Sequence, residues 1–182
     1  MNVLFANLAG VKVDPDGAVR HFIKAGSRWP MTIGFAKSVD YYPFPFWMAY
    51  ALALCKRDTA ATCSGLDGVV MDLTDAEMLV AVKDRQPDLI VTELAALTLA
   101  DDLKFLETVK RETGCKVLVA GNHATVAAAG LLAENACLDF AAIGEYEMTV
   151  KEVIDGLLAG KSDFSDIAGL ACRVGGNVVV GA

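Results

Sequence analysis

The chain has 182 residues, a net charge of −7 and an apolar fraction of 54%. This length suffices for one domain with a sizeable core. Its apolar runs are short and are broken by Gly, Asp and Lys, whereas a membrane helix needs roughly 20 apolar residues in a row. The acidic balance, with no basic face, argues against nucleic acid and anionic membrane surfaces as partners.

The five cysteines, at positions 55, 63, 115, 137 and 172, are far apart and form no CxxC pair. This spacing matches neither a zinc ribbon nor an iron–sulfur site. Met1-Asn2 leads directly into an apolar run without a basic flank, so no signal peptide is expected. Together these features favour reduced, mostly buried thiols in a cytoplasmic protein.

The first third of the chain predicts two strands that enclose a long irregular segment and a helix. Residues 2–8 (NVLFANL) predict a buried strand, and residues 9–42 predict an irregular segment of mixed composition. A loop of that length in a compact domain is usually functional. Residues 44–57 predict a helix that is apolar nearly all round and therefore buried or covered. Residues 59–64 predict a weak second strand.

The rest of the chain predicts alternating helices and strands. Thr74 and Glu77 form a capping box (T-x-x-E) that starts a helix. Gly114 is expected to end another helix, and Gly175-Gly176 to turn a C-terminal β-hairpin. The helices are predicted at residues 75–85, 101–112, 123–135 and 146–158, and the strands at residues 88–93, 116–120 and 139–143.

This alternation predicts an α/β fold with a doubly wound, five-stranded parallel sheet and a C-terminal β-hairpin. Right-handed crossovers restrict the topology to a flavodoxin-like or Rossmann-like one, and five strands favour the order 2-1-3-4-5. Ligands of such sheets bind outside the carboxyl ends of the strands. The candidate site therefore comprises residues 8–10, 93–98, 121–123 and 144–147.

The loop after the first strand carries no known nucleotide motif. A dinucleotide fingerprint would place GxGxxG here, but the sequence is Asn7-Leu8-Ala9-Gly10, and a P-loop is absent too. A phospho-receiver would need an Asp at the end of the third strand, where this chain has Glu93. Taken alone, residues 7–10 are interpreted as a plain turn.

His123 and Glu93 have two interpretations each. His123 follows Gly121-Asn122 and is either a ligand or a polar residue at a helix start that Asn122 caps. No second metal ligand stands near it in the sequence, so neither a metal site nor a catalytic triad is predicted. Glu93 either belongs to a site or is stabilised by the dipole of the helix that follows.

Two further segments are also ambiguous. Glu145 and Glu147 flank Tyr146 at the start of a helix, where carboxylates are favourable whatever the function. The aromatic segment at residues 41–47 (YYPFPFW) is either a lid over the core or one wall of a pocket or an interface.

Several short segments, in order along the chain, together resemble a known family. They are AGSRWP (25–30), YPFPF (42–46) followed by AYA (49–51), PDLIV (87–91), GNHAT (121–125), GEYEMT (144–149) and DIAGLA (166–171). In these segments the chain resembles the N-terminal cobalamin-binding domain of cobalamin-dependent radical S-adenosylmethionine (SAM) enzymes. The resemblance is to the branch with the anaerobic magnesium-protoporphyrin IX monomethyl ester cyclase.

The resemblance implies that residues 1–160 form a Rossmann-like cobalamin-binding domain. Residues 161–182 would form a hairpin or linker toward a radical SAM half, with CxxxCxxC, a [4Fe–4S] cluster and SAM, that this sequence lacks. The corrin ring would lie across the carboxyl ends of the strands, and its nucleotide tail would enter between strands. The residues implied to line it are Leu8, Ala9, Gly10, Glu93, Leu94, Ala95, Ala96, Leu97, Gly121, Asn122, His123, Gly144, Glu145, Tyr146 and Glu147.

The implied cobalamin is base-off and has no protein histidine on the cobalt. Mutase-type proteins carry D-x-H-x-x-G after the first strand, where this chain has Leu8-Ala9-Gly10. The chain would then be a cobalamin-binding module, non-catalytic by itself, that serves a radical SAM domain in cis or in trans. The parent enzyme would be a methyltransferase or an oxidative cyclase. The alternatives are a flavodoxin-like domain that binds a flavin or nucleotide, and a non-catalytic interaction domain.

Overall fold

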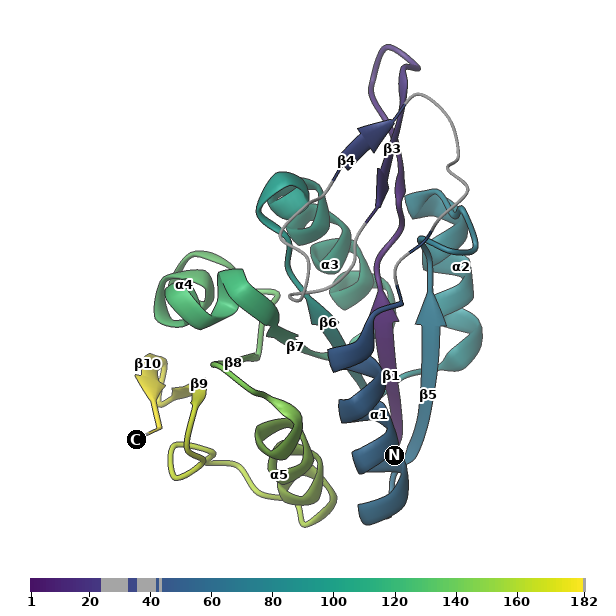
Figure 1. The fold of residues 1–182 in the computed structure, drawn as a ribbon. Helices are drawn as coiled ribbons and strands as arrows, with labels where there is room; N and C mark the ends of the chain where they lie inside the picture. Colours follow the sequence, from purple (N-terminus) through teal and green to yellow (C-terminus); the bar gives the residue numbers. More distant parts are fainter. Residues whose placement is uncertain (24–32, 36–41, 43, 182) are drawn as a thin grey trace.

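The computed structural model describes residues 1–23, 33–35, 42 and 44–181. The matching segment at residues 25–30, together with Tyr41 and Pro43 of the aromatic segment, lies outside these residues. The described chain is a mixed α/β structure, with five α-helices around a mostly parallel sheet of seven strands (Figure 1). None of its helices is long and apolar enough to cross a membrane.

The central sheet has the strand order β10-β9-β8-β7-β6-β1-β5. Its strands are β1 (Asn2–Asn7), β5 (Thr62–Asp67), β6 (Leu89–Glu93), β7 (Lys116–Ala120), β8 (Phe140–Ala142), β9 (Leu170–Val174) and β10 (Asn177–Val180). The helices are α1 (Phe46–Asp58), α2 (Asp75–Arg85), α3 (Leu99–Thr113), α4 (Gly121–Glu134) and α5 (Glu147–Leu158), and a 3-10 helix η1 (Ala96–Thr98) precedes α3.

The complete sheet has seven strands, whereas five were expected, because the two strands of the C-terminal hairpin join the sheet. β9 pairs antiparallel with β8, and β10 pairs antiparallel with β9. The five mutually parallel strands run β5-β1-β6-β7-β8, which is 2-1-3-4-5 when they are numbered along the chain. All five therefore end at the same edge, where the candidate site was predicted.

Local signals placed several boundaries correctly. Thr74 and Glu77 form both hydrogen bonds of the capping box at the start of α2. Gly114 ends α3 with a φ of +70°. Gly175 and Gly176 turn the hairpin with positive φ values of 57° and 87°, which glycine adopts without steric cost.

The prediction of an irregular segment at residues 9–42 was wrong. The described part of this segment forms a separate antiparallel sheet of β2 (Val11–Val13), β3 (Val19–Ile23) and β4 (Ile33–Phe35), called the small sheet below. A turn closed by the Asp14 N–H on the Ala18 carbonyl at 2.8 Å joins β2 to β3. The Asp-Pro-Asp-Gly sequence of this turn is a recognisable signal that the prediction overlooked.

Two other predictions need correction. The second strand lies at Thr62–Asp67 instead of residues 59–64, because Thr59 ends α1 and its hydroxyl donates to the Cys55 carbonyl. α4 starts at Gly121 instead of His123, and its N-cap is Ala120 without a side-chain hydrogen bond. Asn122 therefore lies in the first turn of α4 and does not cap the helix.

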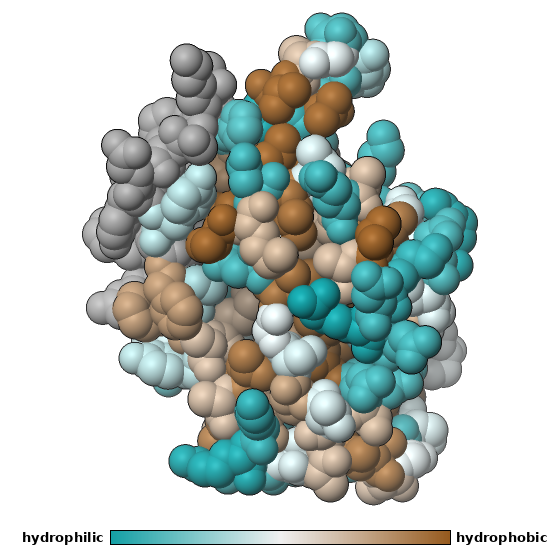
Figure 2. Space-filling view, turned by 90° about the vertical axis from the view of Figure 1, so that its right-hand side faces the viewer, coloured by the Kyte–Doolittle hydropathy of each residue, from teal (hydrophilic) through white to brown (hydrophobic). Residues whose placement is uncertain are grey.

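Two apolar layers cover the faces of the central sheet. One side packs against α2, α3 and α4, with Met78, Leu106 and Leu132 among the fully buried side chains. The other side packs against α1 and α5. Strands covered on both faces explain the continuous apolar runs of the sequence. Viewed from the side of α2 and β5, hydrophobic residues gather mainly in the upper half, toward the small sheet (Figure 2).

All five cysteines are free thiols, and only Cys137 is partly exposed. Burial raises the pKa of the Cys55 thiol to about 12. Burial also raises the pKa values of the other four thiols. At neutral pH these groups are therefore protonated and poor nucleophiles.

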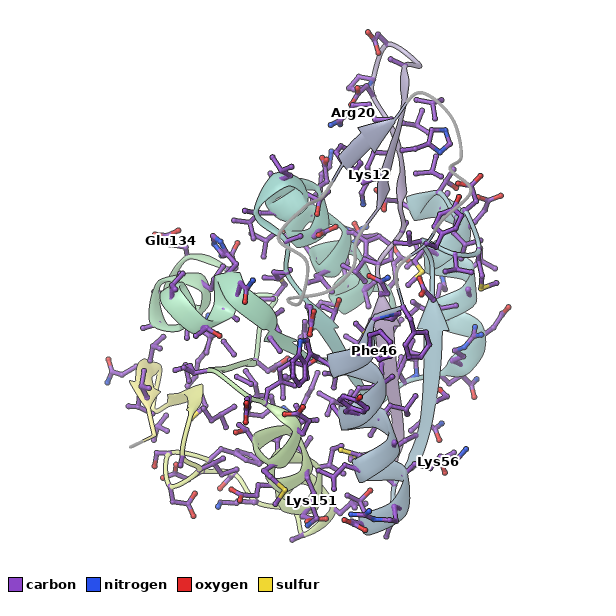
Figure 3. The ribbon with its side chains drawn as sticks, in the orientation of Figure 1. Lys12, Arg20, Phe46, Lys56, Glu134 and Lys151 are labelled. Atoms are coloured by element: carbon purple, nitrogen blue, oxygen red, sulfur yellow. The ribbon has the colours of Figure 1, made fainter. Side chains whose placement is uncertain are left out.

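The small sheet is fastened over the ends of β1 and β5 by a buried ion cluster. Lys12 of β2 is 2% exposed, and its Nζ lies 2.6 Å from Asp75 of α2 and 3.5 Å from Asp102 of α3. The Thr98 hydroxyl donates to the fully buried Asp102 carboxylate at 2.7 Å. Figure 3 places Lys12 in the small sheet, beside Arg20. A buried charge is tolerated only when it is paired, so Lys12 ties three elements into one arrangement.

Replacing Lys12 by methionine should lower the free energy of unfolding by about 3 kcal/mol, because a buried carboxylate loses its cation. Urea denaturation followed by circular dichroism measures this loss. The control is Arg20→Met in the same sheet, since Arg20 pairs with Asp14 and Asp101 at the surface. Arg20→Met should lower the free energy of unfolding much less than Lys12→Met does. Equal decreases for the two variants would contradict the role of the cluster.

Candidate functional site

The ends of three neighbouring strands converge on Glu93. Tyr146, which follows β8, donates its hydroxyl to Glu93 Oε1 at 2.5 Å. Gly121 follows β7 and has a φ of +90°, and a Cβ at this position would lie 3.2 Å from the Cβ of Glu93. Only a residue without a side chain suits this backbone and this close approach. Segments that are distant in sequence thus meet around one carboxylate.

A second link joins the loop after β7 to the loop after β8. The Thr125 hydroxyl donates to the Gly121 carbonyl at 2.9 Å and accepts the Gly144 N–H at 3.0 Å. Thr125 thereby connects the first turn of α4 to the segment that leads into α5. We call Glu93, Gly121, Thr125, Gly144 and Tyr146 the carboxyl-end ring, because their contacts close a circuit.

Tyr146 acts in this ring as a hydrogen-bond donor. Its side chain is 3% exposed, and burial together with the Glu93 carboxylate raises the pKa of the phenol well above its usual range. The phenol therefore keeps its proton at neutral pH. Glu147 lies in the first turn of α5, where the helix dipole favours a carboxylate.

Apolar side chains project into solvent from the segments that follow the same three strands, from η1, α4 and α5. Leu97, Val126 and Met148 follow the ends of β6, β7 and β8 and are 66%, 83% and 56% exposed. All three side chains lie in segments that leave the carboxyl edge of the sheet and are available there for contact with a ligand. We call these three residues the apolar triad.

An aromatic cluster lies at the start of α1. The rings of Phe44 and Phe46 are 5.1 Å apart between centroids, and Tyr50 lies within 6.3 Å of Phe46 and 6.0 Å of Trp47. Phe46 lies at the end of α1 that is nearer the small sheet, and Lys56 at the opposite end (Figure 3). Phe44, Phe46 and Tyr50 are exposed. The described part of the segment at residues 41–47 is therefore not only a buried lid.

The structure separates the predicted site residues into two groups. Leu8, Ala9 and Gly10 are buried beneath the small sheet, where Gly10 accepts the Phe22 N–H at 2.7 Å and packs against Val69. The remaining twelve positions lie at the end of β6 and in the segments that follow β6, β7 and β8, including the first turns of α4 and α5. Of these, Ala96, Leu97, Asn122, Gly144 and Glu145 are exposed, Glu93, Ala95, His123 and Glu147 are partly exposed, and Leu94, Gly121 and Tyr146 are buried.

Sequence reasoning missed two threonines beside the site. Thr125 bridges two loops, and its only sequence signal is its position one helical turn after Gly121. Thr92 precedes Glu93 in β6 and is 1% exposed, and its hydroxyl has no hydrogen-bond partner among the described residues. A buried polar group without a partner is costly, so its presence beside a candidate site is informative.

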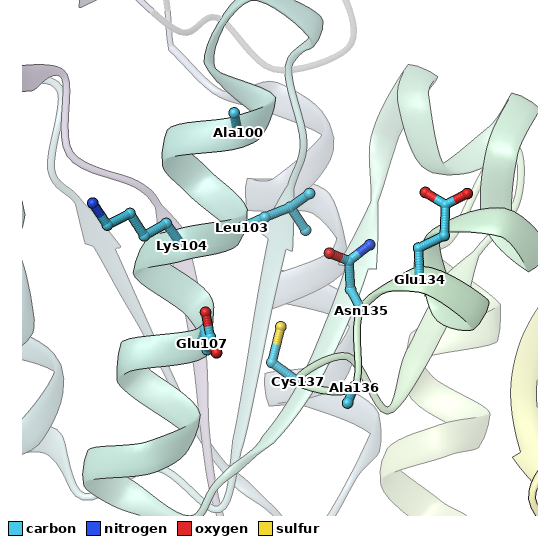
Figure 4. A pocket seen from close by; sticks show the side chains of 8 residues that line it. All are labelled: Ala100, Leu103, Lys104, Glu107, Glu134, Asn135, Ala136 and Cys137. Atoms are coloured by element: carbon cyan, nitrogen blue, oxygen red, sulfur yellow. The ribbon is translucent and has the colours of Figure 1, made fainter.

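The described residues contain no group of three or more His, Cys, Asp or Glu side chains that could hold a metal ion. A groove of about 500 Å³ lies elsewhere, between α3 and the segment that leads from α4 to β8 (Figure 4). Its polar side chains include Lys104, Glu107 and Glu134, which are all exposed. None of the predicted site residues lines this groove.

Comparisons with known proteins agree with the geometry at the level of the fold. No family model matches the chain. An uncharacterized methyltransferase of Pyrococcus horikoshii is 25% identical over 135 residues, which is 74% of this chain and 29% of that protein. The chain therefore spans less than a third of the length of this relative.

Solved structures of the cobalamin-dependent S-adenosylmethionine radical enzyme OxsB match the chain along its whole length. The structure with aqua-cobalamin and S-adenosylmethionine bound has a TM-score of 0.67 at 13% identity, and the chain covers 22% of it. The structure with aqua-cobalamin alone has a TM-score of 0.66 at 12% identity. At this identity the likeness shows a shared fold.

Replacing Gly121 by alanine should destabilise the protein by about 1–2 kcal/mol, because φ is +90° and the new Cβ crowds Glu93. Gly130→Ala is the matched control in the same helix, since a Cβ there meets no atom within 4 Å. It should stabilise the protein by up to about 1 kcal/mol through helix propensity. Urea denaturation measures the free energy of unfolding of both variants. An unchanged value for Gly121→Ala would contradict the close approach of Gly121 to Glu93.

Proposed function

We propose that this chain is a cobalamin-binding module that serves a radical SAM enzyme. The observation that carries the proposal is the carboxyl edge of the sheet beyond β6, β7 and β8, where the segments joined by the carboxyl-end ring expose the apolar triad. A broad, flat macrocycle suits such a surface, and the sequence lacks the glycine-rich loops of the common nucleotide-binding motifs. The fold shared with OxsB, whose structures hold aqua-cobalamin, supports the same ligand.

The residues at this edge fit the group. Leu97, Val126 and Met148 would contact the corrin ring, and Gly121 would let the backbone come close to it. Thr92 offers a buried hydroxyl that still lacks a partner among the described residues, one position before the end of β6. A polar nucleotide tail that enters between strands would satisfy this hydroxyl. The buried positions 8–10 would support the site from beneath the small sheet.

Bound cobalamin would supply a cobalt centre that carries a methyl group or an electron. The residues of this chain would bind the cofactor, orient it and exclude water from one of its faces. No protein histidine is expected on the cobalt, because the loop after β1 has none and is buried. The cofactor would be base-off, because its nucleotide tail would be held between strands, and His123 would lie beside it at the first turn of α4.

The catalytic partner would be a radical SAM domain, joined in cis through residues 161–182 or docked in trans. It would provide the [4Fe–4S] cluster and bind SAM. The reaction of the pair would be methyl transfer or an oxidative ring-forming step. The methyltransferase relative supports the first of these reactions.

Incubation of the protein with hydroxocobalamin, followed by gel filtration, tests the proposal. Corrin absorbance bands should elute with the protein, while FMN and ATP under the same conditions should not. A colourless protein under oxidising and reducing conditions would contradict the proposal. Co-elution of FMN or ATP alone would instead establish the flavodoxin-like alternative.

Replacing Thr92 by valine should have opposite effects on stability and on binding. The ligand-free protein should gain about 1 kcal/mol or more, because a buried hydroxyl without a partner disappears at nearly constant shape. The affinity for hydroxocobalamin should fall, because the tail loses a donor. Thermal unfolding and absorbance titration measure the two effects. If Thr92→Val is more stable but binds hydroxocobalamin with unchanged affinity, the nucleotide tail does not contact Thr92.

A further inference from the structure

The carboxyl-end ring is a closed circuit with links of three kinds. The chain itself joins Gly144 to Tyr146, and two side-chain hydrogen-bond bridges run from Tyr146 to Glu93 and from Thr125 to both Gly121 and Gly144. Tight packing of Gly121 on Glu93 completes the circuit. A circuit holds each of its members from two sides, so one broken link opens the circuit and leaves the members next to the break held from one side only.

The circuit fixes loops that would otherwise be independent. The three loops follow three different strands, and each carries one member of the apolar triad. The exposed side chains themselves make no rigid layer, because solvent surrounds more than half of each one. Their relative positions therefore depend on the backbone beneath them, which the ring sets.

Fixed positions matter for a flat ligand. Ordering loops at the moment of binding costs free energy, and a surface that is ordered beforehand avoids that cost. The hydrogen bond from Tyr146 to the Glu93 carboxylate is the strongest link of the ring, because it is part-buried and assisted by charge.

We infer that Tyr146 and Thr125 are positioning residues that hold the apolar triad in place for the flat face of a corrin ring. This inference rests on the proposed function for the identity of the ligand. It assigns to both side chains an action through the backbone of the three loops, without contact to the ligand.

The test compares hydroxyl deletions in the ring with a matched deletion elsewhere. Tyr146→Phe and Thr125→Val should each weaken the binding of hydroxocobalamin about tenfold, measured by absorbance titration well below the unfolding temperature. Thr125→Ser keeps the hydroxyl and should restore affinity. The double variant should bind no more weakly than either single variant, because the first break already opens the circuit.

Thr113→Val is the control. The Thr113 hydroxyl donates to the Val109 carbonyl at 2.8 Å and accepts the Cys115 N–H at 3.2 Å, the same pattern as in Thr125. It lies at the opposite edge of the sheet, before β7. Thr113→Val should lower the unfolding temperature as Thr125→Val does, yet leave the affinity unchanged.

Three outcomes would overturn the inference: wild-type affinity in both ring variants, an equal loss of affinity in Thr113→Val, or a hundredfold, additive loss in the double variant. Hydrogen exchange of the ligand-free protein separates the inference from the proposed function. Either ring variant should speed exchange at both residues 121–126 and residues 144–148. Failure of the wild type to bind hydroxocobalamin contradicts the proposed function, while faster exchange confined to the mutated loop contradicts the ring.

Discussion

Five parallel strands deliver their carboxyl ends to one edge of the sheet, and every loop that leaves this edge must be packed against something. In this protein the loops divide into two halves. The small sheet covers the ends of β1 and β5, held by the buried pair of Lys12 and Asp102. The segments that follow β6, β7 and β8 expose Leu97, Val126 and Met148 to solvent and are linked to one another through Glu93 and Tyr146. This division decides where a ligand finds access.

Charge and apolar surface are used differently in the two halves. Around the small sheet, the buried Lys12 meets a fully buried carboxylate of α3 and a partly exposed carboxylate of α2, which fixes geometry more than it adds stability. Around the other half, the hydrogen bond from Tyr146 to Glu93 is part-buried, and the apolar side chains of Leu97, Val126 and Met148 face solvent. A surface built in this way is suited to a large, weakly polar partner.

The regular part of the fold was predictable because its signals are local. Apolar runs, the capping box at Thr74 and the glycines at 114 and 175–176 each act within a few residues. The small sheet was missed because its strands are short, and the joining of the hairpin to β8 depends on pairing that no local pattern encodes. Within the site, Glu93 and Tyr146 were named from topology, but their hydrogen bond spans 53 residues of sequence. Thr92 could not be identified from the sequence, because its hydroxyl draws attention only by being buried without a hydrogen-bond partner among the described residues, and burial depends on the packed core.

The C-terminal hairpin has a consequence for how this domain can be cut. β9 covers the edge of β8, a three-residue apolar strand, and β10 ends the sheet with four residues. A chain truncated after residue 160 would leave the backbone groups of β8 unpaired beside apolar side chains. Such an edge recruits strands from other copies, which leads to aggregation. The hairpin therefore belongs to the smallest soluble unit of this fold.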